Sequence, residues 1–543
     1  MATKDGYIIV FFLLNFVFLL VGAQREEDLA HRINRRDLPY KYEDGVSAGG
    51  MKNWNIYNPT HPAEVQDDDS NHVIKRSDFP EDFIFGAASS AYQYEGGIST
   101  RGINNWDIYT HKYKERIVDR SNGDVAVDQI HRYKEDLSFM QETGFHAYRF
   151  SISWTRILRD GTLEGGLNKE GIEYYNNLID DMISKGITPM VTLFHWEIPQ
   201  AFVDEYGGFL SSRIMKDFTD FVDVCFREFG DRVKHWITVN EPNTYTMMGY
   251  ALGQYPPGRC SEWQIHNCLG GNAATEPYIV GHNLILAHAH AVKVYRDKYQ
   301  KTQKGVIGIT VLADWYVPLT DTPADIEAAN RAVDFFSGWF FNPVVHGNYP
   351  ETMISRVKER LPHFTEEQRI LIKGSYDFLG VNYYTSNYAK NDDKPAERPS
   401  YLTDSGAISL NEPSLGPKVN ASSWLAVYPQ GLKDTLMDIK RKYNDPIIYI
   451  TENGYFDYDG PNVKELIDDK KRAEFYNDHL YYLHKAMEDG VKVKGFFAWT
   501  LLDDFEWQSG YTQRFGLIYI DFLNDLKRIP KLSLKWFANF LKN

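Results

Sequence analysis

Short runs of apolar, β-rich residues recur along most of the chain, and amphipathic stretches separate most of them. Each run is continuously apolar rather than alternating between apolar and polar positions, which is the pattern of strands buried on both faces of a parallel sheet. We therefore predict eight buried strands, at Phe83–Ser90, Phe145–Trp154, Thr188–Trp196, Val233–Glu241, Val306–Leu312, Phe378–Thr385, Ile447–Glu452 and Val493–Trp499.

The stretches between these runs repeat apolar residues every three or four positions, as amphipathic helices do. Four of them end just before a glycine, at Gly144, Gly186, Gly230 and Gly490, and we expect each glycine to take the left-handed conformation that ends many helices. Strands that alternate with helices predict an α/β fold, a single (β/α)8 TIM barrel with long βα-loop insertions over residues 77–543. We expect the longest insertions after the fourth and sixth strands.

A doubly wound open sheet is the competing architecture. Such sheets usually carry a glycine-rich phosphate-binding loop after an early strand, and the chain contains neither that motif nor a P-loop. The barrel is therefore favoured. Because parallel barrels place their functional side chains at the carboxyl ends of the strands, chemistry is expected there.

The start of the chain has a different character. Lys4 precedes an apolar run over 7–21, and small residues follow before Gln24, which is typical of a signal peptide over residues 1–23. A transmembrane anchor is the alternative, but a run of about 15 residues is short against the roughly 20 that span a bilayer. Residues 24–76 are polar and indicate a flexible N-terminal leader or pro-segment. We expect the secretory pathway (vacuole, apoplast or ER lumen) and no membrane attachment after signal cleavage.

Composition narrows the possible functions. The 543 residues are 43% hydrophobic, which allows a large core and excludes wholesale disorder, and the net charge of −15 argues against a nucleic-acid partner.

Three cysteines are too few for a disulfide-dense scaffold or a four-ligand zinc site. Cys260 and Cys268 lie close together in a loop-like stretch and favour one short disulfide, whereas Cys225 falls in a helical pattern and favours a buried thiol. Asn420 begins a glycosylation sequon.

Two glutamates directly follow buried strands, although glutamate is a poor strand former. Glu241 ends the fourth predicted strand and Glu452 ends the seventh. Surface exposure, or an ion pair with Arg149, would explain one such residue, but two of them among aromatic and amide side chains indicate a sugar site. Two carboxyls that flank a glycosidic bond supply acid catalysis together with a nucleophile or base.

The strand ends also carry motifs in the order of a known family. They are Asp78–Pro80, Ser90–Gly96, Tyr148–Trp154, Phe194–Trp196, Thr238–Pro242, Asn382–Thr385, Ile450–Gly454, Phe505–Trp507, Gly510–Thr512 and Arg514–Gly516. With these motifs the chain resembles glycoside hydrolase family 1, specifically the plant β-glucosidases, from about residue 77 to its end. No metal and no organic cofactor is implied, because no ligand cluster is visible and acid–base chemistry needs none.

The resemblance implies roles for individual residues. Glu241 matches the general acid/base and Glu452 the nucleophile of a retaining mechanism, while Arg149 and Tyr384 match residues that orient the nucleophile. Residues that match the glucose-binding set are Gln93, His195, Trp196, Asn240, Asn382, Trp499, Glu506 and Trp507. Residues that match the aglycone mouth are Trp424, Asn243, Met247 and Gln508. The Cys260 and Cys268 loop resembles a small disulfide of the plant enzymes.

The leading functional hypothesis is a retaining exo-β-glucosidase that releases glucose and the aglycone of a plant specialised-metabolite glucoside. The alternatives are a transglucosidase that uses an acyl-glucose or another glycoside, a disaccharide-specific β-diglycosidase, and a non-catalytic sugar-binding barrel, against which both glutamates argue. The expected partner is a small-molecule β-glucoside, and the sequence predicts neither the aglycone nor the oligomeric state. The carboxyl pair predicts an acidic optimum at about pH 5–6.

Overall fold

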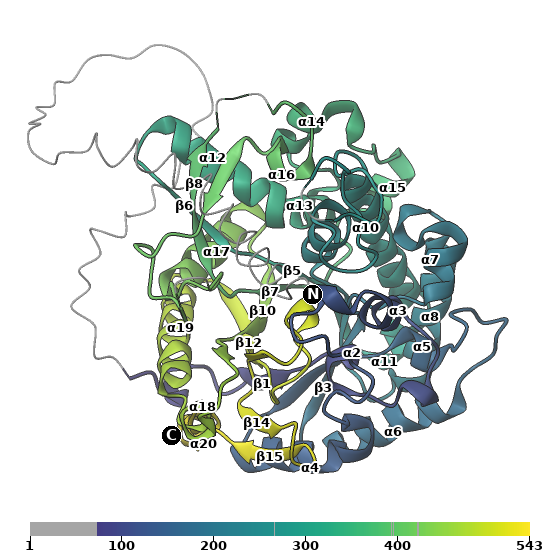
Figure 1. Ribbon diagram of the computed structural model, residues 1–543, viewed down its shortest axis with the longest axis vertical. Coiled ribbons are helices and arrows are strands. Elements are labelled where there is room, and N and C mark those ends of the chain that lie inside the picture. Colours follow the sequence, from purple (N-terminus) through teal and green to yellow (C-terminus); the bar gives the residue numbers. More distant parts are fainter. Residues whose placement is uncertain (1–72, 265–266, 393, 395, 421–422, 543) are drawn as a thin grey trace, which may run out of the picture. The chain divides into compact units, whose positions relative to one another are not determined.

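A computed structural model describes residues 73–543, apart from 265–266, 393, 395, 421–422 and 543 (Figure 1). The expected signal peptide and residues 24–72 of the expected leader lie outside the described residues. At the start of the described chain, Ile74 is buried and donates its backbone N–H to the Asn477 side chain at 3.2 Å. None of the helices in the described residues combines the length and the apolarity needed to span a bilayer.

Eight parallel strands close into a barrel, which confirms the predicted fold. In chain order they are β1 Ile84–Ala88, β2 Ala147–Ser151, β3 Thr188–Phe194, β4 His235–Asn240, β5 Val306–Leu312, β7 Phe378–Asn382, β10 Ile447–Asn453 and β12 Lys492–Trp499. Each strand pairs with the next barrel strand along the chain, and β1 pairs with β12 to close the ring. Both faces of these strands are covered, so most of their residues are buried, which explains the continuously apolar runs.

Amphipathic helices surround the barrel (Figure 1). The long ones are α4 Gln129–Thr143, α6 Lys169–Ser184, α8 Ile214–Phe229, α10 Glu276–Val294, α17 Pro429–Lys442, α19 Lys470–Glu488 and α20 Leu532–Lys542. The shorter ones are α2 Ala91–Tyr94, α3 Asn105–Lys112, α5 Trp154–Ile157, α7 Gln200–Tyr206, α9 Pro242–Thr246, α11 Lys301–Gln303, α12 Pro323–Val333, α13 Trp339–His346, α14 Glu351–Val357, α15 Glu366–Ile372, α16 Tyr401–Asp404 and α18 Val463–Ile467. On α8, Cys225 is a free, buried thiol, as predicted.

Three of the four glycines that follow helices have the predicted conformation. Gly144, Gly186 and Gly490 have φ angles of 89°, 74° and 82°. Gly230 has a φ of −73°, so the prediction of a left-handed glycine is wrong at this position. A Cβ atom on Gly230 would overlap the side-chain amide of Gln303, so close packing rather than backbone conformation accounts for this glycine.

Two connections on the same end of the barrel build a small sheet together. β6 Trp315–Pro318, from the connection after β5, pairs with β8 Ser386–Asn391, and β8 pairs with β9 Ala407–Leu410, both from the connection after β7. The expectation that the longest insertions follow the fourth and sixth strands is therefore incomplete, because 313–377, after the fifth strand, is as extended as 241–305 and 383–446. Two-stranded sheets pair β11 Asp457–Tyr458 with β13 Gln513–Arg514, and β14 Ile518–Asp521 with β15 Lys527–Pro530.

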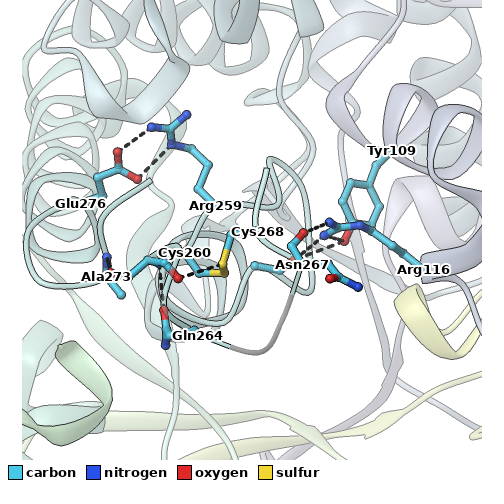
Figure 2. The surroundings of a disulfide bond; sticks show 11 residues. Tyr109, Arg116, Arg259, Cys260, Gln264, Asn267, Cys268, Ala273 and Glu276 are labelled. Atoms are coloured by element: carbon cyan, nitrogen blue, oxygen red, sulfur yellow. Dashed lines mark hydrogen bonds and ion pairs between the residues drawn. A yellow bond between two sulfur atoms is a disulfide. The ribbon is translucent and has the colours of Figure 1, made fainter. Parts of the chain in front are cut away.

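The connection after β4 contains the predicted disulfide Cys260–Cys268 (Figure 2). Arg259, next to the disulfide, forms two hydrogen bonds with the carboxylate of Glu276 on α10, at 2.9 and 2.6 Å. On the other side of the loop, Arg116 donates to the backbone carbonyl of Asn267. The cross-linked loop is thus attached both to α10 and to the connection after β1.

Gly86 in β1 offers a test of barrel packing. A Cβ atom at this position would lie 2.7 Å from the Phe497 ring and against the carbonyl oxygen of Ala147. Because a packed barrel leaves these groups little room to move, we expect Gly86→Ala to lower the free energy of unfolding by about 1–3 kcal/mol, measured as a lower melting temperature. Gly460→Ala is the matched control, since a Cβ atom there meets nothing within 4 Å. Equal melting temperatures for the two variants would contradict this expectation.

Candidate active site

Glu241 and Glu452 lie at the carboxyl ends of β4 and β10, and both are buried. Glu241 is the first residue after β4, and its φ of 42° turns the chain from the strand into α9, which begins with Pro242. A left-handed backbone is uncommon and costly for a glutamate, and residues held in such conformations collect at functional sites. The barrel therefore brings two carboxyl groups from distant parts of the sequence to one end of the fold.

The carboxylate of Glu452 is bound at both oxygens. Arg149 on β2 forms a buried ion pair with Oε1, and the hydroxyl of Tyr384, just after β7, donates to Oε2 at 2.7 Å. The ion pair with Arg149, which the sequence suggested as an alternative reason for a glutamate at a strand end, is therefore present. Both of its side chains are buried. Contacts at both oxygens fix the orientation of this carboxylate.

Glu241 has a different environment. Its Oε1 accepts a hydrogen bond from Nδ2 of Asn382, at the end of β7, at 2.7 Å. Burial, and after it the negative charge of Glu452, raises the pKa of Glu241 to about 8. A carboxyl group holds its proton below its pKa, so Glu241 is protonated from acidic to neutral pH.

Amide side chains connect the surroundings of the two glutamates. Oδ1 of Asn240 accepts hydrogen bonds from Arg149 Nη2 at 2.6 Å and from Asn382 Nδ2 at 3.2 Å. Thr451 donates to Oδ1 of Asn382 at 2.7 Å and so fixes which way that amide points. One hydrogen-bonded chain therefore runs from the residue that binds Glu452 to the residue that binds Glu241.

A second group of the predicted residues surrounds Glu506. Its Oε1 accepts a hydrogen bond from Trp499 Nε1 at 3.0 Å, and its Oε2 accepts one from Gln93 Nε2 at 3.4 Å. Burial raises the pKa of Glu506 to about 7 despite these donors. The rings of Trp507 and Trp196 pack with their centroids 4.7 Å apart, and both residues have a positive φ, 50° and 71°. The structure thus gathers carboxylate, amide and indole groups in one buried cluster.

His195 links this cluster to the amide chain. Its ring is nearly parallel to those of Trp499 and Trp507, at centroid distances of 5.9 and 6.0 Å, and its Nε2 lies 3.1 Å from Nδ2 of Asn240. Among the described residues Nδ1 has no hydrogen-bond partner. Burial, together with the charge of Arg149, lowers the pKa of His195 well below its usual value, so the ring is neutral. A neutral imidazole is able to exchange hydrogen bonds with a hydroxyl group.

Trp424 is the most exposed of the residues predicted to bind glucose or the aglycone. It is 44% exposed, and its ring lies nearly parallel to that of Phe456 with the centroids 5.7 Å apart. It meets Tyr384 edge to face at 6.0 Å. An indole ring open to solvent therefore lies beside the tyrosine that binds Glu452.

The other residues expected at the aglycone mouth differ in burial. Met247 and Gln508 are half-buried. Asn243, on α9, is fully buried. Its side chain donates to the backbone carbonyl of Leu312, at the end of β5, at 2.8 Å. Asn420, the first residue of the sequon, is exposed, and the two residues that follow it lie outside the described part of the chain.

Three residues near the site were missing from the prediction. Thr451 orients Asn382, Asn453 donates to the backbone carbonyl of Tyr383 at 2.7 Å, and Asp504 is a fully buried carboxyl. Thr451 and Asn453 flank Glu452 in the chain, so their position in that motif could have marked them as site residues. Asp504 could have been noticed because three acids, Asp503, Asp504 and Glu506, fall within four residues. No group of three or more His, Cys, Asp or Glu side chains in the described residues is arranged to hold a metal ion.

The charge of Glu452 should be visible in the titration of Glu241. We expect Glu452→Gln to lower the pKa of Glu241 by about one unit, because a like charge that opposes its ionisation is removed. Nuclear magnetic resonance of ¹³C-labelled carboxyl groups measures this directly. The control is Asp136, whose pKa is raised to about 6 by its own burial beside Arg528 and should not change. An unchanged Glu241 titration would contradict the coupling.

Comparisons with known proteins agree with this geometry. Residues 75–543 match the model of glycosyl hydrolase family 1. Beta-glucosidase 24 of Oryza sativa subsp. japonica is 52% identical over 482 residues, which cover 87% of this chain and 95% of that protein. An isoflavonoid 7-O-beta-apiosyl-glucoside beta-glycosidase of Dalbergia nigrescens is 52% identical over 86% of each chain. A solved structure of a rice beta-glucosidase mutant, in a covalent complex with Glc from GA4GE, has a TM-score of 0.84 and 46% identity over 87% of this chain and 100% of that one. The chain therefore belongs to glycosyl hydrolase family 1 and is a glycoside hydrolase.

Proposed function

We propose that this glycoside hydrolase is a retaining exo-β-glucosidase that releases glucose and the aglycone of a plant specialised-metabolite glucoside. The observation that carries the proposal is the contrast between two buried glutamates in one site. Glu452 is bound at both oxygens by Arg149 and Tyr384, whereas Glu241 has a raised pKa. A bound carboxylate beside a protonated carboxyl is the arrangement needed for double displacement at an anomeric carbon.

In the first step Glu452 is the nucleophile. Its carboxylate attacks the anomeric carbon while Glu241 gives its proton to the glycosidic oxygen, so the aglycone leaves as an alcohol and a glucosyl ester of Glu452 forms. Arg149 and Tyr384 hold the attacking carboxylate in one orientation. Asn240, oriented by Arg149, is proposed to bind the 2-hydroxyl, where hydrogen bonds strengthen in the transition state.

In the second step Glu241 is the base. It takes a proton from water, the water oxygen attacks the anomeric carbon, and Glu452 is released with the configuration at that carbon retained. Esterification of Glu452 removes the negative charge that raised the pKa of Glu241, so the pKa falls when a base is required. Proton donation by Glu241 is available below about pH 8 and lost above it, which supports activity from the expected acidic optimum into the neutral range.

The glucosyl unit is proposed to lie in the cluster around Glu506. Trp499 offers an indole face, and Glu506, Gln93 and His195 offer hydrogen-bond partners for hydroxyl groups. All these side chains are buried, so contacts with a sugar would be made away from bulk water.

The aglycone is proposed to lie toward Trp424. An exposed indole beside Tyr384 supports a flat or apolar aglycone. The Dalbergia nigrescens relative is named for an apiosyl-glucoside, at the same identity as the rice β-glucosidase. A disaccharide-specific activity is therefore the second candidate, and a panel of mono- and diglucosides separates the two.

Hydrolysis of 4-nitrophenyl β-D-glucoside tests the roles of the two glutamates. We expect Glu452→Gln to abolish nitrophenol release, because no glucosyl ester forms. Glu241→Gln should lose less hydrolytic activity on this substrate, whose leaving group is activated, than on an alkyl glucoside. For the alkyl glucoside we expect the rate of hydrolysis to fall by about 10²–10⁴-fold. Glu205→Gln, in an exposed ion pair with Arg213, is the control and should match the parent. Activity in Glu452→Gln, or α-glucose as the first product by nuclear magnetic resonance, would refute the retaining mechanism.

Trp424→Ala tests the aglycone assignment. We expect KM for aryl β-glucosides to rise by about two- to tenfold, because an aromatic contact is lost, with little change for methyl β-glucoside. Trp263→Ala is the matched control, since that indole is 43% exposed but lies in the loop closed by the disulfide. Equal losses on aryl and methyl glucosides, or equal effects of the two variants, would contradict the assignment.

A further inference from the structure

Asp504 is a buried carboxyl that the mechanism does not use. Its side chain has no exposed surface, and among the described residues no other side chain or backbone group donates a hydrogen bond to either of its oxygens. No other carboxyl in residues 73–543, as far as these are described, has both oxygens buried and unpaired. Only the backbone N–H of Asp504 itself favours its charged form.

The ionisable groups that face Asp504 are acidic. They come from its own segment, from β10, from α2 and from the turn before β13, and they are Asp503, Glu506, Glu452, Tyr94 and Tyr511. The cations of this region are already paired with other acids, Lys531 and Arg514 with Asp503, and Arg149 with Glu452. A negative charge at Asp504 would therefore be repelled by several acids and would have no cation of its own to pair with.

The two neighbouring acids differ from Asp504 because they have donors. Asp503 accepts hydrogen bonds from Lys531 Nζ at 2.7 Å and from the backbone N–H of Gly516 at 2.9 Å. Glu506 accepts hydrogen bonds from an indole and an amide, as described above. Donors stabilise the ionised form of a buried carboxyl, and a buried charge without them is strongly unfavourable. We therefore expect the proton of this acidic segment to reside on Asp504, which has no donor apart from its own backbone N–H.

We propose that Asp504 and Glu506 form a pair in which Glu506 gives up its proton first, so that the one proton left on the pair resides on Asp504 while the ionised Glu506 accepts hydrogen bonds from glucose hydroxyls. Asp504 is then a positioning residue, which acts on the sugar only through Glu506. The inference rests on the proposed function, because it assumes that glucose binds at Glu506. Two acids with different surroundings divide the roles of proton holder and charged acceptor.

The pair should respond to pH in two stages. Burial, followed by the charges of Glu506 and Asp503, raises the pKa of Asp504 well above its usual value, whereas the pKa of Glu506 rises only to about 7. As pH increases, Glu506 loses its proton first and sugar binding is favoured. At higher pH Asp504 also ionises and places a second negative charge beside Glu506 and Glu452, which disturbs the glucose end of the site.

Infrared difference spectroscopy at about pH 8 locates the proton, through the carbonyl band of protonated carboxyl groups. We expect Asp504→Asn to remove part of this band and Glu506→Gln to leave it unchanged. Asp136→Asn is the control, since that buried acid is paired with Arg528 and its pKa is raised only to about 6. Loss of the band in Glu506→Gln, in both variants or in neither would overturn the proposal.

Glucose binding tests the consequence for the sugar, in the Glu241→Gln background so that the titration of Glu241 does not contribute. We expect the Kd for glucose to rise by about tenfold for each pH unit above the pKa of Asp504, and we expect this rise to disappear when Asp504→Asn is added. Equal pH dependence in the two proteins would overturn the proposal. Absence of glucose binding at every pH in both would instead overturn the proposed function and the sugar-binding role with it, while the infrared result would still locate the proton.

Discussion

Arg149 forms the buried contacts on which the arrangement of the site depends. Its guanidinium pairs with Glu452 on β10 and donates to Asn240 at the end of β4. A cation without access to water requires an opposite charge and hydrogen-bond acceptors, and removing Glu452 would leave the charge of Arg149 uncompensated. Asn240 in turn accepts from Asn382, which binds Glu241. One buried arginine thus ties the ends of four barrel strands together and sets both glutamates relative to each other.

The acids of the site differ chiefly in the number of donors that reach them. Glu452 receives a guanidinium and a phenol, Glu506 an indole and an amide, Glu241 one amide, and Asp504 no group outside its own backbone. All four acids are buried, so bulk water neither solvates nor screens their charges. The charge state of each acid therefore depends on its own contacts. The proposed roles of nucleophile, proton donor and sugar acceptor thus fall to glutamates that differ only in their surroundings.

The barrel and its connections have separate tasks. The strands are covered on both faces and hold the two glutamates rigidly, whereas the connections after β4, β5 and β7 are long and form sheets, helices and a disulfide of their own. Trp424 belongs to one of these connections and is open to solvent. Two relatives with the same 52% identity to this chain carry different names, a rice beta-glucosidase and an apiosyl-glucoside beta-glycosidase, as expected when loops on a shared scaffold select the substrate.

The sequence alone predicted the eight barrel strands, three of the four helix ends assigned to glycines, the disulfide and the residues that gather at the site, because continuous apolar runs, helical periodicity and short motifs are local properties of the chain. What it missed depends on partners distant in sequence. Gly230 is required by the close approach of Gln303, and the connection after β5 extends far enough to pair β6 with β8. The isolation of Asp504 depends on which donors its acidic neighbours have already taken. Only the folded chain decides such matters, because burial and the supply of hydrogen-bond donors are set by all the segments that meet at one place.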